Sequence, residues 1–133
     1  MSSPHAFAFD AVAVQLVAAL DAYDRETEAV IAAWPDLERY REFSAQLEKI
    51  RGYSSGLHDL RVQWVELLIA HAELVHFLWR IEYGDAESAR AEVVAVREHH
   101  ADCVMALRNR CLRIQMRVKL RRPAPAGNTS VPR

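Results

Sequence analysis

Two histidines and a cysteine interrupt the apolar stripes in the second half of the chain. His71 lies in a run of leucines with helical spacing, and His100 and Cys103 lie on the next such stripe. If the two stretches form an antiparallel hairpin about Gly84, residue i faces roughly residue 168 − i, which puts His100 about one turn from the position opposite His71. Imidazole and thiolate groups bind zinc, and a structural zinc site uses four such ligands. The spacing therefore makes His71, His100 and Cys103 candidate ligands for zinc or another transition metal.

A buried histidine with a hydrogen-bonded neighbour explains the same pattern without a metal. A free cysteine on an apolar stripe behaves as a small hydrophobic residue. Zinc sites usually show close pairs such as C-x-x-C, and this chain has none. We therefore expect no bound cofactor and a His71 buried at the centre of the fold. A metal- or redox-responsive sensor is the alternative.

The same stretch holds the ingredients of a Cys/His nucleophilic site. His100 and Cys103 are three residues apart, so their side chains can touch on one helix face. However, the spacing places no third group to orient the histidine, and the chain has no glycine-rich phosphate loop. We therefore expect no catalytic residues and no enzymatic activity.

Charge is unevenly distributed along the chain. All 18 acidic residues precede residue 103, whereas the last 30 residues hold eight bases. We expect this basic end to meet the acidic first half of a neighbouring subunit. Exposed ion pairs contribute only about 0–1 kcal/mol each, so charge would set orientation rather than affinity. A nucleic-acid-associated regulator is the alternative, but the bases wrap around the helix, which does not favour base-specific readout.

Apolar periodicity predicts two helices in the first half of the chain. The first should run from about Asp10 to Trp34, with Asp10 as its N-cap. Pro35 disfavours helical geometry just before it and suits the first turn of a new helix, so the second should begin near Asp36. The glycines and serines of residues 52–56 predict a break or a kink.

The second half carries two longer apolar patterns. Residues spaced three and four apart, as in a coiled-coil seam, form the first of them: Leu57, Leu60, Trp64, Leu67, His71, Leu74, Leu78 and Ile81. Gly84 and Asp85 should end this helix and cap the next. The last helix should extend to about Leu120, because Pro123 cannot continue it.

These elements predict an all-α fold, an antiparallel bundle of three to four helices with a long C-terminal helix. Residues 10–120 should form a single domain, between a flexible N-terminus at 1–9 and a disordered basic, proline-rich tail at 121–133. Only two cysteines, no secretory signal and no apolar stretch of membrane-spanning length point to the cytoplasm.

The last helix should extend beyond a compact bundle, since it is the longest. Its apolar stripe would then need a cover from outside the chain, and a second copy supplies one. We therefore predict a small non-enzymatic protein that acts by helix-mediated self-association, as a homodimer, or by binding a partner protein. The predicted interaction residues are Leu107, Cys111, Ile114, Val118, Arg108, Arg113, Arg117 and Arg121.

Overall fold

Four α-helices build the described part of the chain. The computed structural model describes residues 4–84 and 86–121, with side chains described for 10–84, 86–117 and 120. The elements are α1 (Pro4–Ala32), α2 (Leu37–Ser54), the single 3₁₀ turn η1 (His58–Leu60), α3 (Arg61–Tyr83) and α4 (Ala86–Arg121). No strand occurs in these two stretches, and the predicted all-α bundle with a long C-terminal helix is confirmed.

The helix α1 begins at Pro4, earlier than the predicted start at Asp10. A proline is tolerated in a first turn because its missing N–H has no helical partner there. The inward face of α1 repeats every three or four residues, as an amphipathic helix requires. Its buried members are Ala13, Leu16, Leu20, Tyr23, Thr27 and Val30.

The helix α2 begins close to the predicted start near Asp36, and Asp36 is its N-cap. A carboxylate oxygen of Asp36 accepts hydrogen bonds from the backbone N–H groups of Glu38 and Arg39, at 2.9 and 3.3 Å. At the other end α2 includes Gly52 and continues to Ser54. The break predicted for residues 52–56 therefore comes only after Ser54, where the chain crosses to α3.

The helices α3 and α4 form the predicted antiparallel hairpin about Gly84, whose N–H donates to the carbonyl of Arg80 at 3.0 Å. A Cβ atom at Gly84 would come within 3.3 Å of that carbonyl oxygen, so glycine suits the close turn. The predicted cap Asp85 lies outside the described residues. All eight residues of the predicted α3 seam are buried or half-buried, as its periodicity implies.

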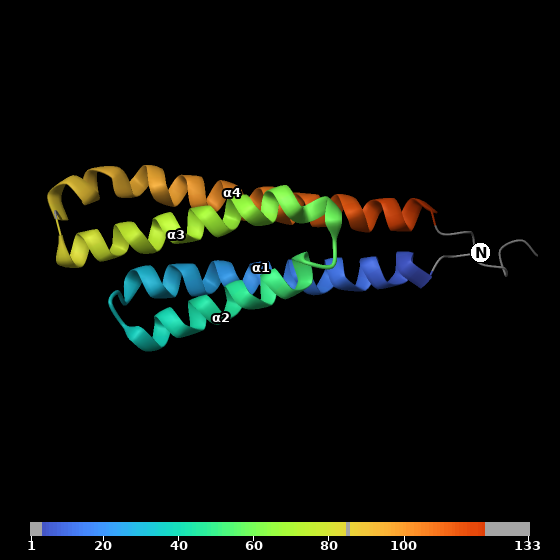
Figure 1. Ribbon diagram of the computed structural model, residues 1–133, viewed down its shortest axis with the longest axis horizontal. Helices are drawn as coiled ribbons and strands as arrows, with labels where there is room; N and C mark the ends of the chain where they lie inside the picture. Colours follow the sequence, from blue (N-terminus) through green and yellow to red (C-terminus); the bar gives the residue numbers. More distant parts are fainter. Residues whose placement is uncertain (1–3, 85, 122–133) are drawn as a thin grey trace, which may run out of the picture.

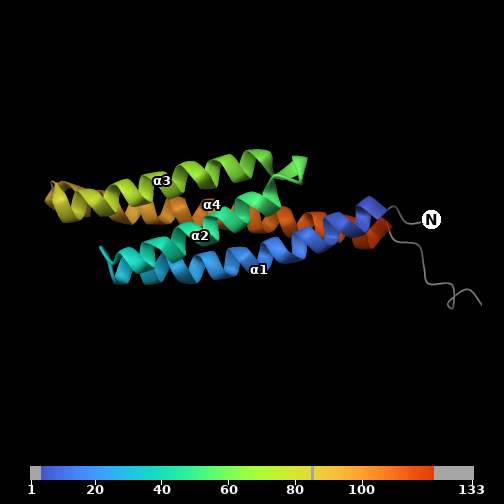
Figure 2. The same cartoon turned by 60° about the horizontal axis from the view of Figure 1, so that its bottom comes forward.

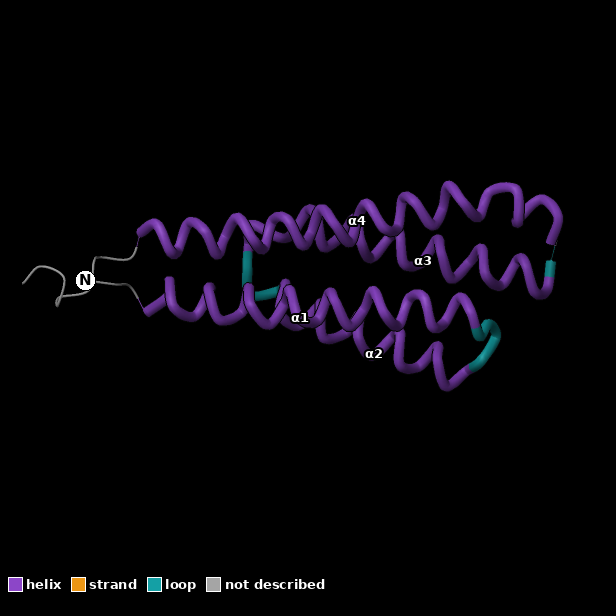
Figure 3. Tube along the Cα trace, turned by 180° about the vertical axis from the view of Figure 1, so that it is seen from behind, coloured by secondary structure: helices purple, strands orange, loops and turns teal. Residues whose placement is uncertain are grey.

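The bundle consists of two helical hairpins, α1–α2 and α3–α4 (Figure 3). The helices α1 and α4 run alongside each other in opposite directions and extend together beyond α2 and α3 (Figures 1 and 2). By contrast, α2 and α3 make far fewer contacts with each other than each makes with its hairpin partner. None of the helices within 4–84 and 86–121 combines the length and hydrophobicity that a membrane span needs.

Candidate functional site: a buried His–Tyr–His cluster

Tyr23 of α1 joins the two histidines at the centre of the bundle. Its hydroxyl lies 2.8 Å from Nδ1 of His71 on α3 and 2.7 Å from Nε2 of His100 on α4. The side chain of Tyr23 is fully buried, and the two histidines are 8% and 3% exposed. The burial predicted for His71 is therefore confirmed. Both hydrogen bonds connect the first hairpin to the second.

Phe43 brings α2 into the same cluster. Its ring stacks on His71 with 4.4 Å between the ring centroids, and on Tyr23 with 5.1 Å. Such offset stacks add about 0.5–1.5 kcal/mol beyond the burial of area. All four helices thus contribute one ring to the cluster formed by Tyr23, Phe43, His71 and His100, which we call the His–Tyr–His cluster.

Burial controls the ionisation of the cluster. It lowers the pKa of His71 from 6.5 to about 4, because an imidazolium loses its hydration in the core. Burial likewise lowers the pKa of His100 to about 4, with smaller contributions from His71 and His99. Burial raises the pKa of Tyr23 well above its ordinary value, with Asp24 acting in the same direction. All three groups are therefore neutral at pH 7.

A narrow pocket reaches the cluster from the surface between α1 and α4. It has a volume of about 30 Å³, which is enough for one water molecule. His100 lies at this pocket together with Thr27, Asp24, Arg97 and Glu28. The pocket thus offers space for water beside His100.

Cys103 does not join the two histidines. Its sulfur lies 3.8 Å from Nε2 of His99, whereas His71 and His100 turn their nitrogens to Tyr23. Among the described residues there is no group of three or more His, Cys, Asp or Glu side chains that could hold a metal ion. The predicted metal ligands His71, His100 and Cys103 are therefore not brought together as a metal site. Periodicity had placed them on facing stripes, but it did not show that the tyrosine lies between them.

Both cysteines are buried thiols in the core. Burial raises the pKa of Cys103, and it raises the pKa of Cys111 to about 11. A thiol is a poor nucleophile and a poor metal ligand, since both roles require the thiolate. The chemistry of these two residues at neutral pH is that of small apolar side chains.

One sequence pattern was missed in the prediction. Residues 52–56 fit the G-x-S-x-G pattern that surrounds the nucleophile of many serine hydrolases. That pattern works on a sharp turn between a strand and a helix, whereas Ser54 lies in the last turn of α2. Its hydroxyl is buried and has no hydrogen-bond partner, so no base is placed to activate it. The pattern is therefore not a nucleophile site in this fold.

The apolar residues predicted for an interface lie inside the bundle. Leu107, Cys111 and Ile114 are 0, 0 and 7% exposed. The helix α1 runs antiparallel along this part of α4 (Figure 2), and the ion pair of Arg108 with Asp21 places the middle of α1 beside Leu107. The prediction that this stripe needs a cover from a second chain is therefore wrong for these three residues. The side chains of Val118 and Arg121 lie outside the described residues.

Replacing Leu107 tests this placement. We expect Leu107→Ala to lower the free energy of unfolding by about 2–5 kcal/mol, because it leaves a cavity beneath α1. The matched control is Met105→Ala on the same helix, which is 54% exposed and should change that free energy by less than about 0.5 kcal/mol. Urea denaturation followed by circular dichroism measures both. Equal effects of the two substitutions would contradict the buried position.

The predicted basic residues divide into paired and unpaired ones. Arg108 forms an ion pair with Asp21 of α1, and Arg117 lies 3.5 Å from Asp59 of η1. Arg113 is exposed. The basic end of α4 thus meets acidic residues of its own chain, which reduces the charge left for a partner.

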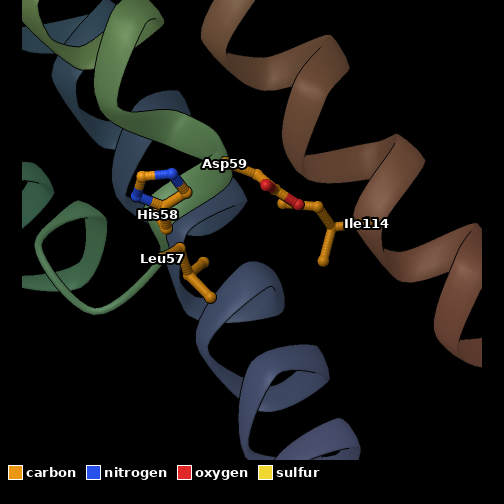
Figure 4. A pocket seen from close by; sticks show the side chains of 4 residues that line it. All are labelled: Leu57, His58, Asp59 and Ile114. Carbon is orange, nitrogen blue, oxygen red and sulfur yellow. The ribbon is translucent and has the colours of Figure 1, made fainter.

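A second pocket lies where the chain crosses between the hairpins (Figure 4). It has a volume of about 170 Å³ and is lined by Leu57, His58, Asp59 and Ile114. This volume is below the roughly 300 Å³ at which small-molecule pockets usually begin. Because Asp59 is already paired with Arg117, the imidazole of His58 is the polar side chain left at this pocket.

Comparisons of the chain with protein-family models, with curated proteins and with solved structures give no match. No family is shown. Inference about function therefore starts from the chain's own surfaces and from the His–Tyr–His cluster.

Tyr23 and Phe43 are the members of the cluster that the sequence prediction lacked. Neither of them was connected to the histidines from the sequence alone. A usable signal did exist, because a tyrosine on a core stripe needs a hydrogen-bond partner for its hydroxyl. Buried histidines on two other helices were the available partners.

Proposed function

We propose that the protein acts by helix-mediated self-association, as a homodimer that pairs α3 with α3 of a second copy. The observation that carries this proposal is an apolar surface on the side of α3 opposite the core. We call it the outer face of α3, and it consists of Val62, Val65, Leu68 and Ile69. These side chains are 62, 43, 43 and 53% exposed, respectively.

Helical geometry supports such a surface as an interface. A helix that is apolar on both sides is typically buried on both sides. The inner seam of α3 packs mainly on α4, whereas the outer face has no cover among the described residues. Soluble monomers seldom expose large contiguous apolar surfaces without a binding role.

The spacing of the outer face suits a two-fold axis. Val62, Val65, Ile69, Ala72 and His76 follow one another at intervals of three, four, three and four residues. With two α3 helices antiparallel across Ile69, the two Ile69 side chains meet on the axis, Val65 of each copy lies near Ala72 of the other, and Val62 lies near His76. Such self-complementarity is what a dimer with two-fold symmetry requires.

Light scattering of the full chain tests the proposal. The expected mass at micromolar concentration is near twice 15.2 kDa. We expect Ile69→Lys to raise the Kd at least about 100-fold, or about 2.7 kcal/mol, because it places the ammonium groups of both copies opposite each other at the two-fold axis and removes their hydration. The fold should survive, since Ile69 faces away from the core.

The matched control is Val14→Lys on α1. Val14 is 51% exposed, close to the 53% of Ile69, but it lies outside the outer face of α3. This control should leave the mass unchanged. A wild-type monomer at ~100 µM, a concentration above most useful affinities, would refute the proposal.

A further inference from the structure

The two hydrogen bonds of the His–Tyr–His cluster limit how many protons it can take up. The hydroxyl of Tyr23 has one hydrogen, so it donates to one imidazole nitrogen and accepts an N–H from the other. The imidazole that donates its N–H to Tyr23 can take a first added proton on its other ring nitrogen. Both hydrogen bonds then stay in place. A second added proton must go to the other imidazole, on the nitrogen that accepts the hydroxyl hydrogen of Tyr23. The hydroxyl hydrogen then has no acceptor, and two cations face one oxygen.

The helices around the cluster differ in how extensively they contact one another. The helices α1 and α4 are tied by a long contact and by the ion pairs Arg108–Asp21 and Arg97–Glu28, the latter at 3.0 Å. Contacts between α2 and α3 are few. The side of the bundle between α2 and α3 is therefore the side that can open.

On that side, the two hairpins are joined largely by contacts between aromatic rings. One is the stack of Phe43 on His71. Another is the edge contact of Trp34, which follows α1, with Trp79 of α3, at 4.8 Å between ring centroids. Protonation of His71 acts directly on the first contact, because an imidazolium needs hydration that the core does not provide.

Charged groups around the cluster come from α1, α3 and α4. Asp24 and Glu28 of α1 lie at the water-sized pocket beside His100, across from Arg97 of α4. His99 and Cys103 of α4 lie nearby, and the carboxylates of Asp102 on α4 and of Glu66 and Glu73 on α3 act on Cys103. The helix α2 contributes the uncharged ring of Phe43. With two carboxylates and one guanidinium, the pocket favours the approach of a proton to His100.

We propose that the His–Tyr–His cluster is a pH switch, in which the uptake of two protons separates α2 from α3 while α1 and α4 stay in contact. The closed form requires both hydrogen bonds to Tyr23. The open form lets both imidazolium groups reach water. This inference is independent of the self-association proposed above, which concerns the opposite side of α3.

The range of the switch follows from burial. In the closed form the pKa of each histidine is about 4, whereas the usual value of 6.5 applies once the group is hydrated. Opening should therefore occur between these two pH values. It should be steep, since two protons bind together to the open form. The helices themselves should persist, because the contacts within each hairpin do not involve the histidines' protons.

A pH titration of the full chain tests the switch. Near-ultraviolet circular dichroism and fluorescence follow the Trp34–Trp79 contact, and far-ultraviolet circular dichroism follows helix content. The expected result is a steep change in the tryptophan signals at a pH where helix content is unchanged. Trp34→Phe should remove most of that change. Simultaneous loss of both signals would overturn the proposal, because it indicates ordinary acid unfolding.

Histidine variants identify the groups that bind the protons. We expect His71→Gln and His100→Gln each to reduce the proton uptake on opening from about two to about one, and the double variant to show no opening above pH 4. The matched control His58→Gln replaces an exposed histidine and should change nothing. A double variant that opens as the wild type does would overturn the proposal.

A second variant covers the case in which the glutamine variants do not fold. Tyr23→Phe keeps both histidines and the ring but removes the shared hydroxyl. It should open at a higher pH than the wild type, because the closed form has lost both hydrogen bonds. An unchanged opening pH would show that these bonds do not hold the closed form. Repeating the titration on Ile69→Lys separates the switch from self-association, and the same opening pH is expected there.

Discussion

The free energy of unfolding of the closed form should fall by about 4 kcal/mol between pH 7 and pH 5, with about half from each of His71 and His100. In the folded chain each pKa is lowered to about 4, whereas the unfolded chain has the usual 6.5. As the pH falls below 6.5, the unfolded state binds protons that the folded state does not. The stability contributed by the neutral histidines is therefore complete above about pH 7 and decreases with falling pH until about pH 4.

Urea denaturation at pH 7, 6 and 5 measures this slope. His100→Gln should halve the decrease, and the double variant His71→Gln/His100→Gln should nearly remove it. His58→Gln serves as the control and should keep the full decrease, since His58 is exposed. An equal pH dependence in the wild type and the double variant would assign the effect to other groups.

Periodicity predicted most of the local structure because it reports which face of a helix is apolar. The eight seam residues between Leu57 and Ile81 are buried or half-buried as expected, and the turn at Gly84 fixes the register of α3 against α4. A short turn makes such a register readable from the sequence. For this reason His71 and His100 could be predicted on facing stripes.

The register of α1 against α4 could not be predicted in the same way. These helices are the first and the last of the chain, so no turn connects them. Tyr23 was therefore not matched to the histidines. The early start of α1 at Pro4 was not predicted, because residues 4–9 carry no strong apolar repeat. The predicted interface at Leu107 was wrong because the course of α1 along α4 was not predicted.

The charge pattern was also ambiguous for a physical reason. An acidic first half and a basic end attract each other whether they belong to one chain or to two. The antiparallel course of α1 and α4 brings Arg108 to Asp21 within the chain. Net charge along the sequence does not contain that information.

The hydroxyl of Tyr23 should matter far more than that of an ordinary tyrosine. We expect Tyr23→Phe to lower the free energy of unfolding by about 1–3 kcal/mol, because two buried imidazoles lose their shared partner. The control is Tyr53→Phe, whose half-buried side chain donates to Gln15 at 3.3 Å and should cost at most about 0.5 kcal/mol. Tyr23→Ala also removes the ring beneath Phe43, and it should cost about 5 kcal/mol. Urea denaturation at pH 7 compares the three variants.

A triple variant separates the stability of the cluster from its response to pH. Tyr23→Phe, His71→Leu and His100→Leu together replace every polar group of the cluster by an apolar one. Because no partner is left unpaired, the triple variant should be about as stable at pH 7 as the wild type, although Tyr23→Phe alone is destabilising. It should also keep that stability at pH 5, where the wild type has lost about 4 kcal/mol. If Tyr23→Phe cost no more than Tyr53→Phe, the hydrogen bonds to the two histidines would not hold the hairpins together.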